Sequence, residues 1–232
     1  MIVSQASDRL PTDRLPTDRL IERLAADARP VRRLRPPMTR AALWLVAVAG
    51  VAGIAILSFA NLPVLGDRMR DASLTLEMTG ALLAGIAAVI AAFHLSLPDR
   101  PNAWALLPAP GLALWLGGSG YGCYSDWIRF GTERWELGDS AACLRFILIA
   151  SIPLGATLLI ALRRACPLAP VRVAAVGGLG VAALSAFLLQ FFHPFDVTVL
   201  DLAVHVLAVG IVVAVSSWSG RIIPQYGVKV PA

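Results

Sequence analysis

Six apolar segments, each about as long as a bilayer is thick, place the strongest constraint on the fold of this chain. A helix needs about 20 apolar residues to cross a hydrocarbon core of about 30 Å. A window of that length finds segments at residues 41–62, 74–97, 103–120, 143–162, 173–192 and 199–218. The third segment contains Pro108, Pro110 and Gly111, which predicts a kinked span whose backbone groups are satisfied by neighbouring helices.

The composition agrees with a membrane protein. Hydrophobic residues make up 57% of the 232 positions and charged residues only 15%, whereas about 25% of the residues in a soluble domain are charged. The sequence therefore predicts an all-α fold, a polytopic membrane helix bundle with about six transmembrane helices. The predicted divisions are an N-terminal segment 1–40, a transmembrane domain 41–219 and a tail 220–232.

The positions of Lys and Arg predict the orientation of the bundle. The first forty residues mix acidic with basic side chains and lack the apolar core of a signal peptide. If the N-terminus lies inside, about fifteen basic residues fall on the inner side and about five on the outer side, as expected for cytoplasmic loops. We therefore predict a multi-pass protein of the bacterial inner membrane with both termini in the cytoplasm.

The N-terminal segment contains the first candidate binding surface. Prolines recur every five residues at its start, so a continuous helix is excluded there. We expect a helix from about residue 18 to residue 28, with Asp18 in its first turn. Its apolar residues Leu20, Ile21 and Leu24 form one stripe.

A basic connector links this predicted helix to the first span. Its arginines are Arg32, Arg33 and Arg35. The helix and connector suit attachment to anionic lipid, a simple topology signal, or docking of the helix into a groove on a soluble cytoplasmic protein. Direct nucleic acid binding is not expected, because acidic residues are interleaved with the arginines and no aromatic side chains accompany them.

Cysteines and acidic residues gather on the predicted outer side. The predicted loop 121–142 is net acidic and contains Cys123, and Cys143 follows it directly. On the outer face of a bacterial inner membrane these thiols suit a disulfide or a soft metal. A partly buried, inert thiol is the structural alternative for each of them.

Polar residues near the last two spans form a second candidate cluster. Asp201 and His205 are four positions apart and share one helical face. Because charge inside a membrane is costly, such residues usually face protein or water. They indicate either a metal or proton site, joined by His94 or Cys143, or an interhelical hydrogen-bonded pair that locks the bundle. The cluster consists of His193, Asp196, Asp201 and His205.

Motifs of common enzymes are missing from the sequence. It has no glycine-rich phosphate loop, nucleophile elbow, metalloprotease histidine pair or tandem paired-cysteine site, so we predict that the chain is not an enzyme. A small transporter would need polar residues at several depths, but here they collect near one face. A structural membrane subunit is a further alternative.

The N-terminal stretch TDRLIERLAAD at residues 17–27 is followed by PVRRLRPP at residues 30–37 and by the six apolar segments. Together these features resemble the NrsF family, the multi-pass anti-sigma factors named negative regulators of sigma-F. The resemblance covers nearly the whole chain from residue 17. It implies that the N-terminal segment holds an extracytoplasmic-function sigma factor at the inner membrane until a periplasmic stress signal, a metal or an oxidant, releases it.

Sensing in that family is associated with a pair of outward-facing cysteines. Cys143 resembles the first of them, whereas this chain has His193, directly before a proline, where the second is expected. The resemblance therefore implies either that Cys123 is the partner of Cys143 or that a transient divalent metal binds on the periplasmic side. The candidate metal ligands are Cys143, His193, Asp196, Asp201 and His205.

Overall fold

The computed structural model of this protein describes residues 17–27, 34–131, 137–192 and 198–222. The chain separates into two compact units, Met1–Leu34 and Arg35–Ala232. The boundary between these units falls within the basic connector. Four predicted site residues lie outside the described residues: Arg32, Arg33, His193 and Asp196.

The described residues of the first unit form helix α1 (Thr17–Ala26). It occupies the range that the apolar stripe predicts and ends two residues earlier than expected. Its sequence has a polar face and an apolar face, which is typical of a helix that needs a second surface to bury its apolar side.

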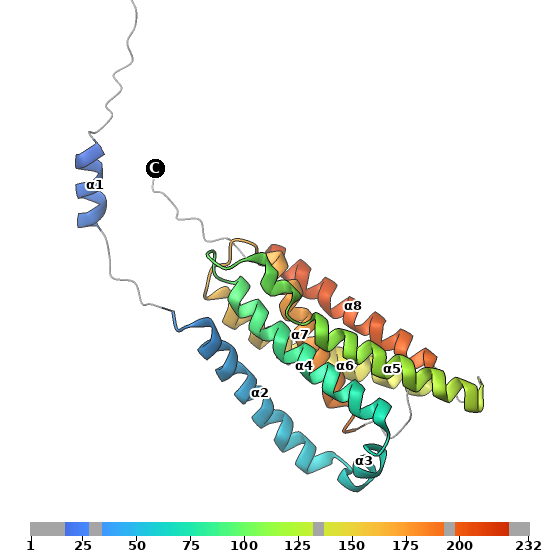
Figure 1. The fold of residues 1–232 in the computed structure, drawn as a ribbon. Helices are drawn as coiled ribbons and strands as arrows, with labels where there is room; N and C mark the ends of the chain where they lie inside the picture. Colours follow the sequence, from blue (N-terminus) through green and yellow to red (C-terminus); the bar gives the residue numbers. More distant parts are fainter. Residues whose placement is uncertain (1–16, 28–33, 132–136, 193–197, 223–232) are drawn as a thin grey trace, which may run out of the picture. The chain divides into compact units, whose positions relative to one another are not determined.

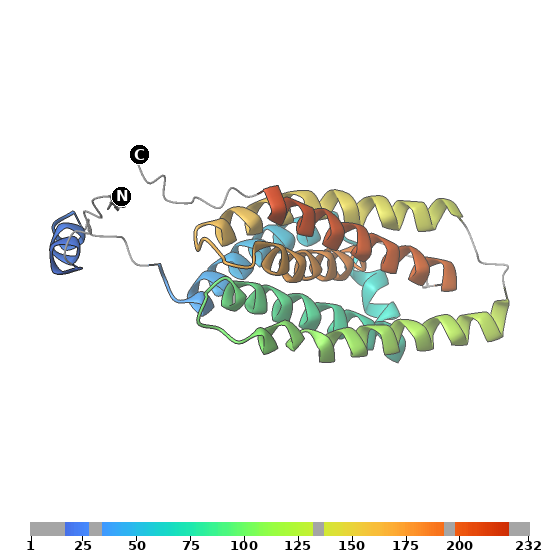
Figure 2. The same ribbon diagram turned by 90° about the horizontal axis from the view of Figure 1, so that it is seen from above.

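The second unit is an elongated helix bundle, and its long helices run up and down the long axis in turn (Figures 1 and 2). Two short elements, α3 and η1, lie between long helices. The elements are α2 (Pro37–Phe59), α3 (Leu62–Arg68), α4 (Ala72–Leu95), η1 (Asn102–Leu106), α5 (Ala109–Phe130), α6 (Leu137–Arg163), α7 (Pro170–Leu189) and α8 (Val199–Ile222). The described residues form no β-strand, so the predicted all-α bundle is confirmed.

The two ends of the bundle contain different residues, and we name each after one of them. The Arg40 end holds the first turn of α2 and the last turns of α6, where Arg40 contacts Ala161. The Asp201 end holds the first turns of α6 and α8, where Ser140 contacts Asp201.

Local sequence signals begin several of these helices. Pro37 and Pro170 occupy the first turns of α2 and α7, where the missing N–H of proline has no intrahelical partner to lose. Asp71 caps α4, because its carboxylate accepts a hydrogen bond of 2.9 Å from the backbone N–H of Ser73. Asn61 caps α3 in the same way through the N–H of Val64.

Helices α4 and α7 form the centre of the bundle. In their most apolar windows, 67% of α4 and 61% of α7 is buried, compared with 28% of α8, 22% of α6 and 6% of α2. The core is centred on Val89, Phe93 and Val181, which are fully buried. Close approach of α4 and α5 depends on glycine, because a Cβ at Gly80 or at Gly111 would lie under 3.0 Å from backbone atoms of the facing helix.

Five of the described helices are long and apolar enough to cross a membrane: α2, α4, α6, α7 and α8. The remaining predicted span, residues 103–120, differs from the structure. Residues 102–106 form the short helix η1, and the long helix α5 runs from Ala109 to Phe130 beside α4. The prolines therefore separate η1 from α5 rather than kink one span, because a proline near a helix start costs little.

The predicted outer loop 121–142 is also wrong in part. Helix α5 continues through Tyr121 and Cys123 to Phe130, and α6 begins at Leu137. Polar and aromatic residues in these turns led to the loop prediction, but helix ends that extend beyond a hydrocarbon layer are free to be polar.

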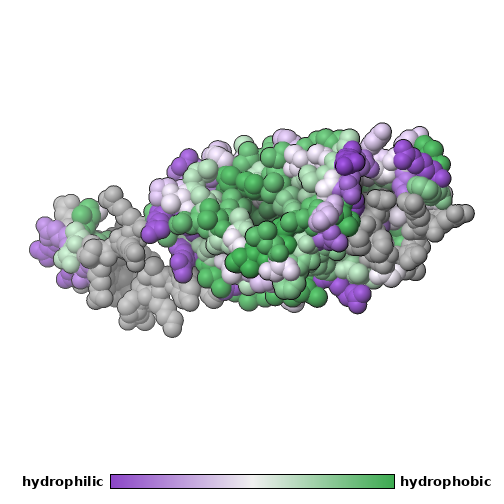
Figure 3. Space-filling model, turned by 90° about the horizontal axis from the view of Figure 1, so that it is seen from below, coloured by the Kyte–Doolittle hydropathy of each residue, from purple (hydrophilic) through white to green (hydrophobic). Residues whose placement is uncertain are grey.

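The surface of the bundle agrees with a bilayer as its solvent. Figure 3 shows an apolar band over the middle of the molecule and hydrophilic residues concentrated toward its two ends. Large apolar side chains of the long helices are strongly exposed, among them Val51 at 71%, Leu57 at 79% and Ile152 at 69%. Such a continuous apolar surface is stable only in lipid, so the chain is a membrane protein.

Candidate functional site

Helix α1 presents the predicted apolar stripe on its surface. Leu20, Ile21 and Leu24 are exposed by 46%, 58% and 65%, and their spacing places them on one face of the helix. The side chain of Asp18 is not among those described, and Arg35, in the described part of the connector, is exposed. Three neighbouring exposed aliphatic side chains give α1 an unburied apolar face that suits a groove on another protein.

The Asp201 end contains a hydrogen-bonded polar cluster centred on the carboxylate of Asp201. Ser140 on α6 donates a hydrogen bond of 2.5 Å to Oδ1. The backbone N–H and the hydroxyl of Thr198 donate to Oδ2 at 3.0 Å and 2.7 Å. The N–H of Asp201 in turn donates to the Thr198 hydroxyl at 3.3 Å, which completes a reciprocal cap at the start of α8.

The cap and the interhelical bond give Asp201 two roles at once. It accepts hydrogen bonds from Thr198, directly before α8, and it holds the first turn of α6 against α8. Asp201 is only 6% exposed. Loss of the Ser140 or Thr198 donors would therefore leave carboxylate oxygens buried without hydrogen-bond partners, which is costly.

The ring of His205 contacts the backbone of Asp201. Its Nδ1 lies 2.7 Å from the backbone oxygen of Asp201, one helical turn away. The prediction that the two residues share one face is confirmed, since both are buried against the bundle. The carboxylate turns toward α6, because the Ser140 hydroxyl gives it a partner on another helix.

The two candidate sensing thiols occupy different surroundings. Cys123 on α5 is 3% exposed and its Sγ donates to the backbone oxygen of Thr198 at 3.2 Å. Cys143 on α6 is 1% exposed and packs with Ile147, Ala186 and Leu189. Both are thiols in this structure. Cys123 therefore touches the capped start of α8, and Cys143 lies one turn from Ser140, so both adjoin the Asp201 cluster through their own helices.

The predicted metal ligands are only partly within the described residues. Cys143, Asp201 and His205 are described, whereas His193 and Asp196 are not. Within the part of the chain that the structure describes, no three His, Cys, Asp or Glu side chains are grouped to hold a metal ion. A site that uses the segment 193–197 stays a prediction.

A buried carboxylate that the sequence reasoning missed lies at the same end. Glu77 on α4 and Gln190 after α7 are each 5% exposed, and Gln190 Nε2 donates to Glu77 Oε1 at 2.9 Å. The signal was available, because Glu77 is the sole acidic residue in the apolar segment 74–97. An ionisable side chain inside a span marks either a structural partner on another helix or a functional site.

A cavity of about 100 Å³ opens beside Glu77 between the start of α4 and the end of α5. Its lining combines both signs of charge, with arginines and carboxylates from α3, α4 and α5. The charged lining residues are Arg68, Asp71, Glu77, Asp126 and Arg129. A volume of this size holds a few water molecules or a small polar solute, and water reaching the cavity would contact a nine-tenths buried carboxylate.

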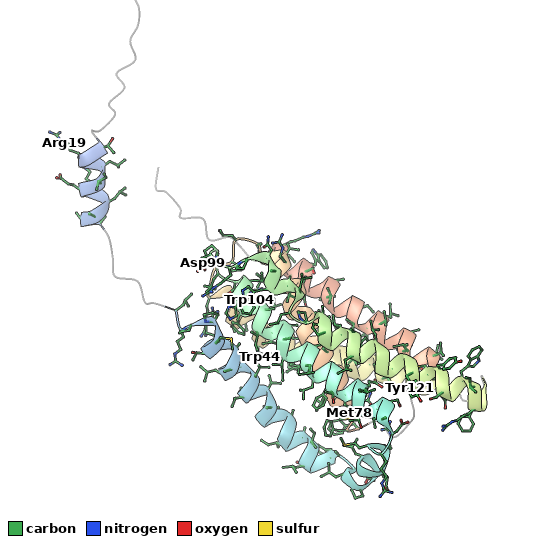
Figure 4. The ribbon with its side chains drawn as sticks, viewed as in Figure 1. Arg19, Trp44, Met78, Asp99, Trp104 and Tyr121 are labelled. Atoms are coloured by element: carbon green, nitrogen blue, oxygen red, sulfur yellow. The ribbon has the colours of Figure 1, made fainter. Side chains whose placement is uncertain are left out.

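The Arg40 end has a second set of polar contacts, and Figure 4 shows Trp44 and Trp104 toward this end, away from Met78 and Tyr121. The position of Trp44 near the start of the first apolar segment is typical of an interfacial anchor. Trp44 is instead 8% exposed, and its Nε1 donates to the hydroxyl of Thr157 on α6 at 3.2 Å. Sequence position near a span end does not distinguish an anchor in the headgroups from a tryptophan turned toward a neighbouring helix.

His94 is far from the residues with which it was grouped. It lies in the last turn of α4, at the Arg40 end, and its ring stacks on Trp104 with centroids 3.8 Å apart. The prediction that His94 joins Asp201 and His205 is therefore wrong. The helix that carries it begins at the Asp201 end and runs the length of the bundle before reaching His94.

Comparison with known proteins adds one finding. Residues 24–226 match the model of the NrsF family, described as negative regulator of sigma F. No curated protein and no solved structure matches the chain. The family match covers the whole bundle and begins within α1, at Leu24 of the apolar stripe.

Proposed function

The chain belongs to the NrsF family of negative regulators of sigma F, and on that premise we propose that it is a membrane-embedded anti-sigma factor. Its N-terminal segment binds an extracytoplasmic-function sigma factor on the cytoplasmic face of a bacterial inner membrane. A periplasmic stress signal, a metal or an oxidant, acts at the Asp201 end and releases that sigma factor. Both termini are cytoplasmic in this arrangement.

The single observation that carries the proposal is the apolar stripe of α1. Leu20, Ile21 and Leu24 are exposed by 46% or more on a helix of 10 residues. A helix of that length is marginal alone in water, because tertiary contacts supply most helical stability. Full burial of three such side chains in a groove would contribute roughly 1.5–3 kcal/mol each, before the entropic cost of binding.

Charge supports a protein partner for the segment over a purely lipidic one. Helix α1 itself carries Glu22 beside Arg19 and Arg23, so its polar face is mixed rather than uniformly basic. Membrane-surface helices have lysine and arginine along the whole polar face. The arginines of the connector are well placed beside the first span to contact anionic lipid while α1 contacts the sigma factor.

The signal site in this proposal is the Asp201 end. Cys143 on α6 and Cys123 on α5 both adjoin the hydrogen bonds around Asp201 and Thr198. Oxidation of either thiol, or a divalent metal bound with the help of His193 and the nearby segment, would disturb those bonds. Release then follows from a difference in sigma-factor affinity between two arrangements of the bundle, for which a few kcal/mol is enough.

Retention of the sigma factor tests the docking step. The full chain is placed in lipid nanodiscs and incubated with the extracytoplasmic-function sigma factor encoded beside it. Changing Leu20, Ile21 and Leu24 together to Asp should reduce retention at least a hundredfold, because three charges would enter an apolar groove. Ala26→Asp on the polar face of α1 is the matched control and should change retention less than threefold.

The opposite result identifies the alternatives. Equal retention by the triple variant would move the binding surface away from α1. If the unaltered chain retains no sigma factor, a structural membrane subunit becomes the better description. For the signal site, Cys143→Ser and His193→Ala should each alter sigma-dependent transcription under metal or peroxide, and an unchanged response in both would remove that site.

A further inference from the structure

Helix α6 reaches both ends of the bundle as one uninterrupted element. It has 27 residues, which corresponds to about 40 Å at 1.5 Å per residue. In its first turn Ser140 bonds to Asp201 on α8. In its last turns Thr157 and Ala161 bond to α2. The same helix therefore contacts the proposed signal site and the helix that follows the sigma-binding segment.

Helix α2 packs against α4 and α6, and its buried residues lie near its start. Ala41 and Trp44 are its only buried residues. The guanidinium of Arg40 donates to the backbone oxygen of Ala161 at 2.5 Å and lies 5.0 Å above the ring of Phe93. Further along, a Cβ at Gly50 or Gly53 would meet no atom within 4 Å. The position of the α2 start thus depends on contacts with α6 and on Phe93 of α4.

The two side-chain hydrogen bonds of α2 to other helices both end on α6. The Trp44 bond reaches α6 one turn after a proline. The Thr157 hydroxyl that accepts from Trp44 also donates to the carbonyl oxygens of Pro153 and Leu154, which share its proton. Pro153 lies inside α6 and has no N–H for the carbonyl of Ile149. One ladder bond is therefore missing one turn before Thr157, and the helix can bend there.

On the N-terminal side of Pro153, a side-chain contact holds α6 to α7. Ser151 Oγ and Ser185 Oγ on α7 are 3.2 Å apart and both are buried. Residues 140–151 of α6 are thus bonded to α7 and α8. The turns after Pro153 are bonded to α2. Pro153 thus separates a part of α6 that is bonded to α7 and α8 from a part that is bonded to α2.

We propose that Trp44 and Thr157 are positioning residues through which α6 transmits a change at the Asp201 end to the start of α2 and so to the sigma-binding segment. This inference rests on the proposed function and names how its signal crosses the membrane. Breaking the Ser140–Asp201 bond lets the first part of α6 move, Pro153 converts that movement into a bend, and the Thr157–Trp44 bond carries it to α2.

The test compares a trigger variant with and without the Thr157–Trp44 bond, in the full chain in nanodiscs. Ser140→Ala is the trigger, and Asp201→Ala is a second trigger that removes both carboxylate oxygens. Thr157→Val and Trp44→Phe remove the hydrogen bond while they keep most of the side-chain volume. Thr157→Ser keeps the hydroxyl, and Trp218→Phe on α8, where the side chain is 65% exposed, is the matched tryptophan control.

Two readouts separate transmission from sigma binding. The first is the Kd for the sigma factor, which each trigger should raise about fivefold or more, at the low end of usual allosteric couplings. The second is hydrogen exchange of the backbone amides at residues 38–45, which each trigger should accelerate at least threefold. When a trigger is combined with Thr157→Ser or Trp218→Phe, the changes in Kd and in exchange rate should both persist. When a trigger is combined with Thr157→Val or Trp44→Phe, both changes should fall below twofold.

Two results would overturn the inference. One is an equal response to the triggers with Thr157→Val and Trp44→Phe, which would show that the bond does not carry the signal. The other is unchanged exchange at residues 38–45 with both triggers. If the unaltered chain does not bind the sigma factor, the proposed function fails, yet the exchange measurements still decide whether α6 couples the two ends.

Discussion

Helices α2 and α4 are nearly equal in length and hydropathy, and they are packed very differently. Helix α2 has 23 residues and a mean hydropathy of 2.3 in its most apolar window, and α4 has 24 residues and a value of 2.0. Only 6% of the α2 window is buried, against 67% for α4. Hydropathy therefore determines that a helix enters the membrane, and it says nothing about the position of that helix in the bundle.

Glycine content does not distinguish the two helices either. Gly50 and Gly53 of α2 face no neighbouring atom, whereas Gly80 of α4 faces the backbone of α5. Lipid tails are as apolar as leucine, so apolar surface alone gives no drive for helices to associate within the bilayer. Shape, close backbone contact and polar pairs such as Glu77 with Gln190 decide which helix becomes central.

The largest expected effect tests the close contact of α4. Gly80→Ala places a Cβ under 3.0 Å from backbone atoms of Trp115, which cannot rotate away. We expect the free energy of unfolding to fall by about 3 kcal/mol or more. Gly50→Ala on α2 should leave it unchanged or raise it by about 1 kcal/mol through helix propensity. Thermal unfolding followed by circular dichroism in detergent measures both, and equal effects would abolish the contrast between the helices.

A matched pair of phenylalanines sharpens the same comparison. Phe93 on α4 is fully buried, and Phe59 on α2 is 81% exposed. Phe93→Ala leaves a cavity and removes the ring below Arg40, so we expect a loss of about 2–3 kcal/mol, at or below the range for soluble cores because lipid is also apolar. Phe59→Ala should change stability by less than about 0.5 kcal/mol. Denaturant unfolding of both variants in the same detergent decides the outcome.

The smallest of the three effects concerns the polar pair. Glu77→Ala leaves the Nε2 of Gln190 buried without its acceptor, which should lower the free energy of unfolding by about 1–2 kcal/mol. Glu77→Gln retains an oxygen acceptor and should cost less than half as much. A more stable Glu77→Ala variant would mean that burial of the carboxylate costs more than the hydrogen bond returns.

Prediction from the sequence succeeded where the physical signal is local. Long apolar runs predicted the positions of α2, α4, α6, α7 and α8 within a few residues, and the stripe of Leu20, Ile21 and Leu24 predicted α1. It failed at α5, where prolines and polar residues indicated a kinked span followed by a loop. Those prolines lie at helix starts instead, and which role a proline takes depends on the surrounding helices.

The end of the bundle at which the candidate site residues lie was predicted better than their hydrogen-bond partners. Asp201 and the two cysteines do lie toward one end, since alternation of spans assigns each helix terminus to a side. Ser140 and Thr198 were not foreseen as partners of Asp201, and His94 was assigned to the wrong end. Side-chain pairing between helices depends on their rotation and depth, for which a single sequence contains no direct signal.

By itself, the sequence determined that this chain enters a membrane as helices and that it carries a short amphipathic helix before the first span. Length, hydropathy and periodicity act residue by residue, so they can be recognised before any fold is known. Only the tertiary structure decided that α4 is central and α2 peripheral, and that α6 joins Asp201 at one end to Trp44 at the other. In lipid those choices depend on close contacts and polar partners between segments far apart in the chain, and such contacts exist only once the helices have packed.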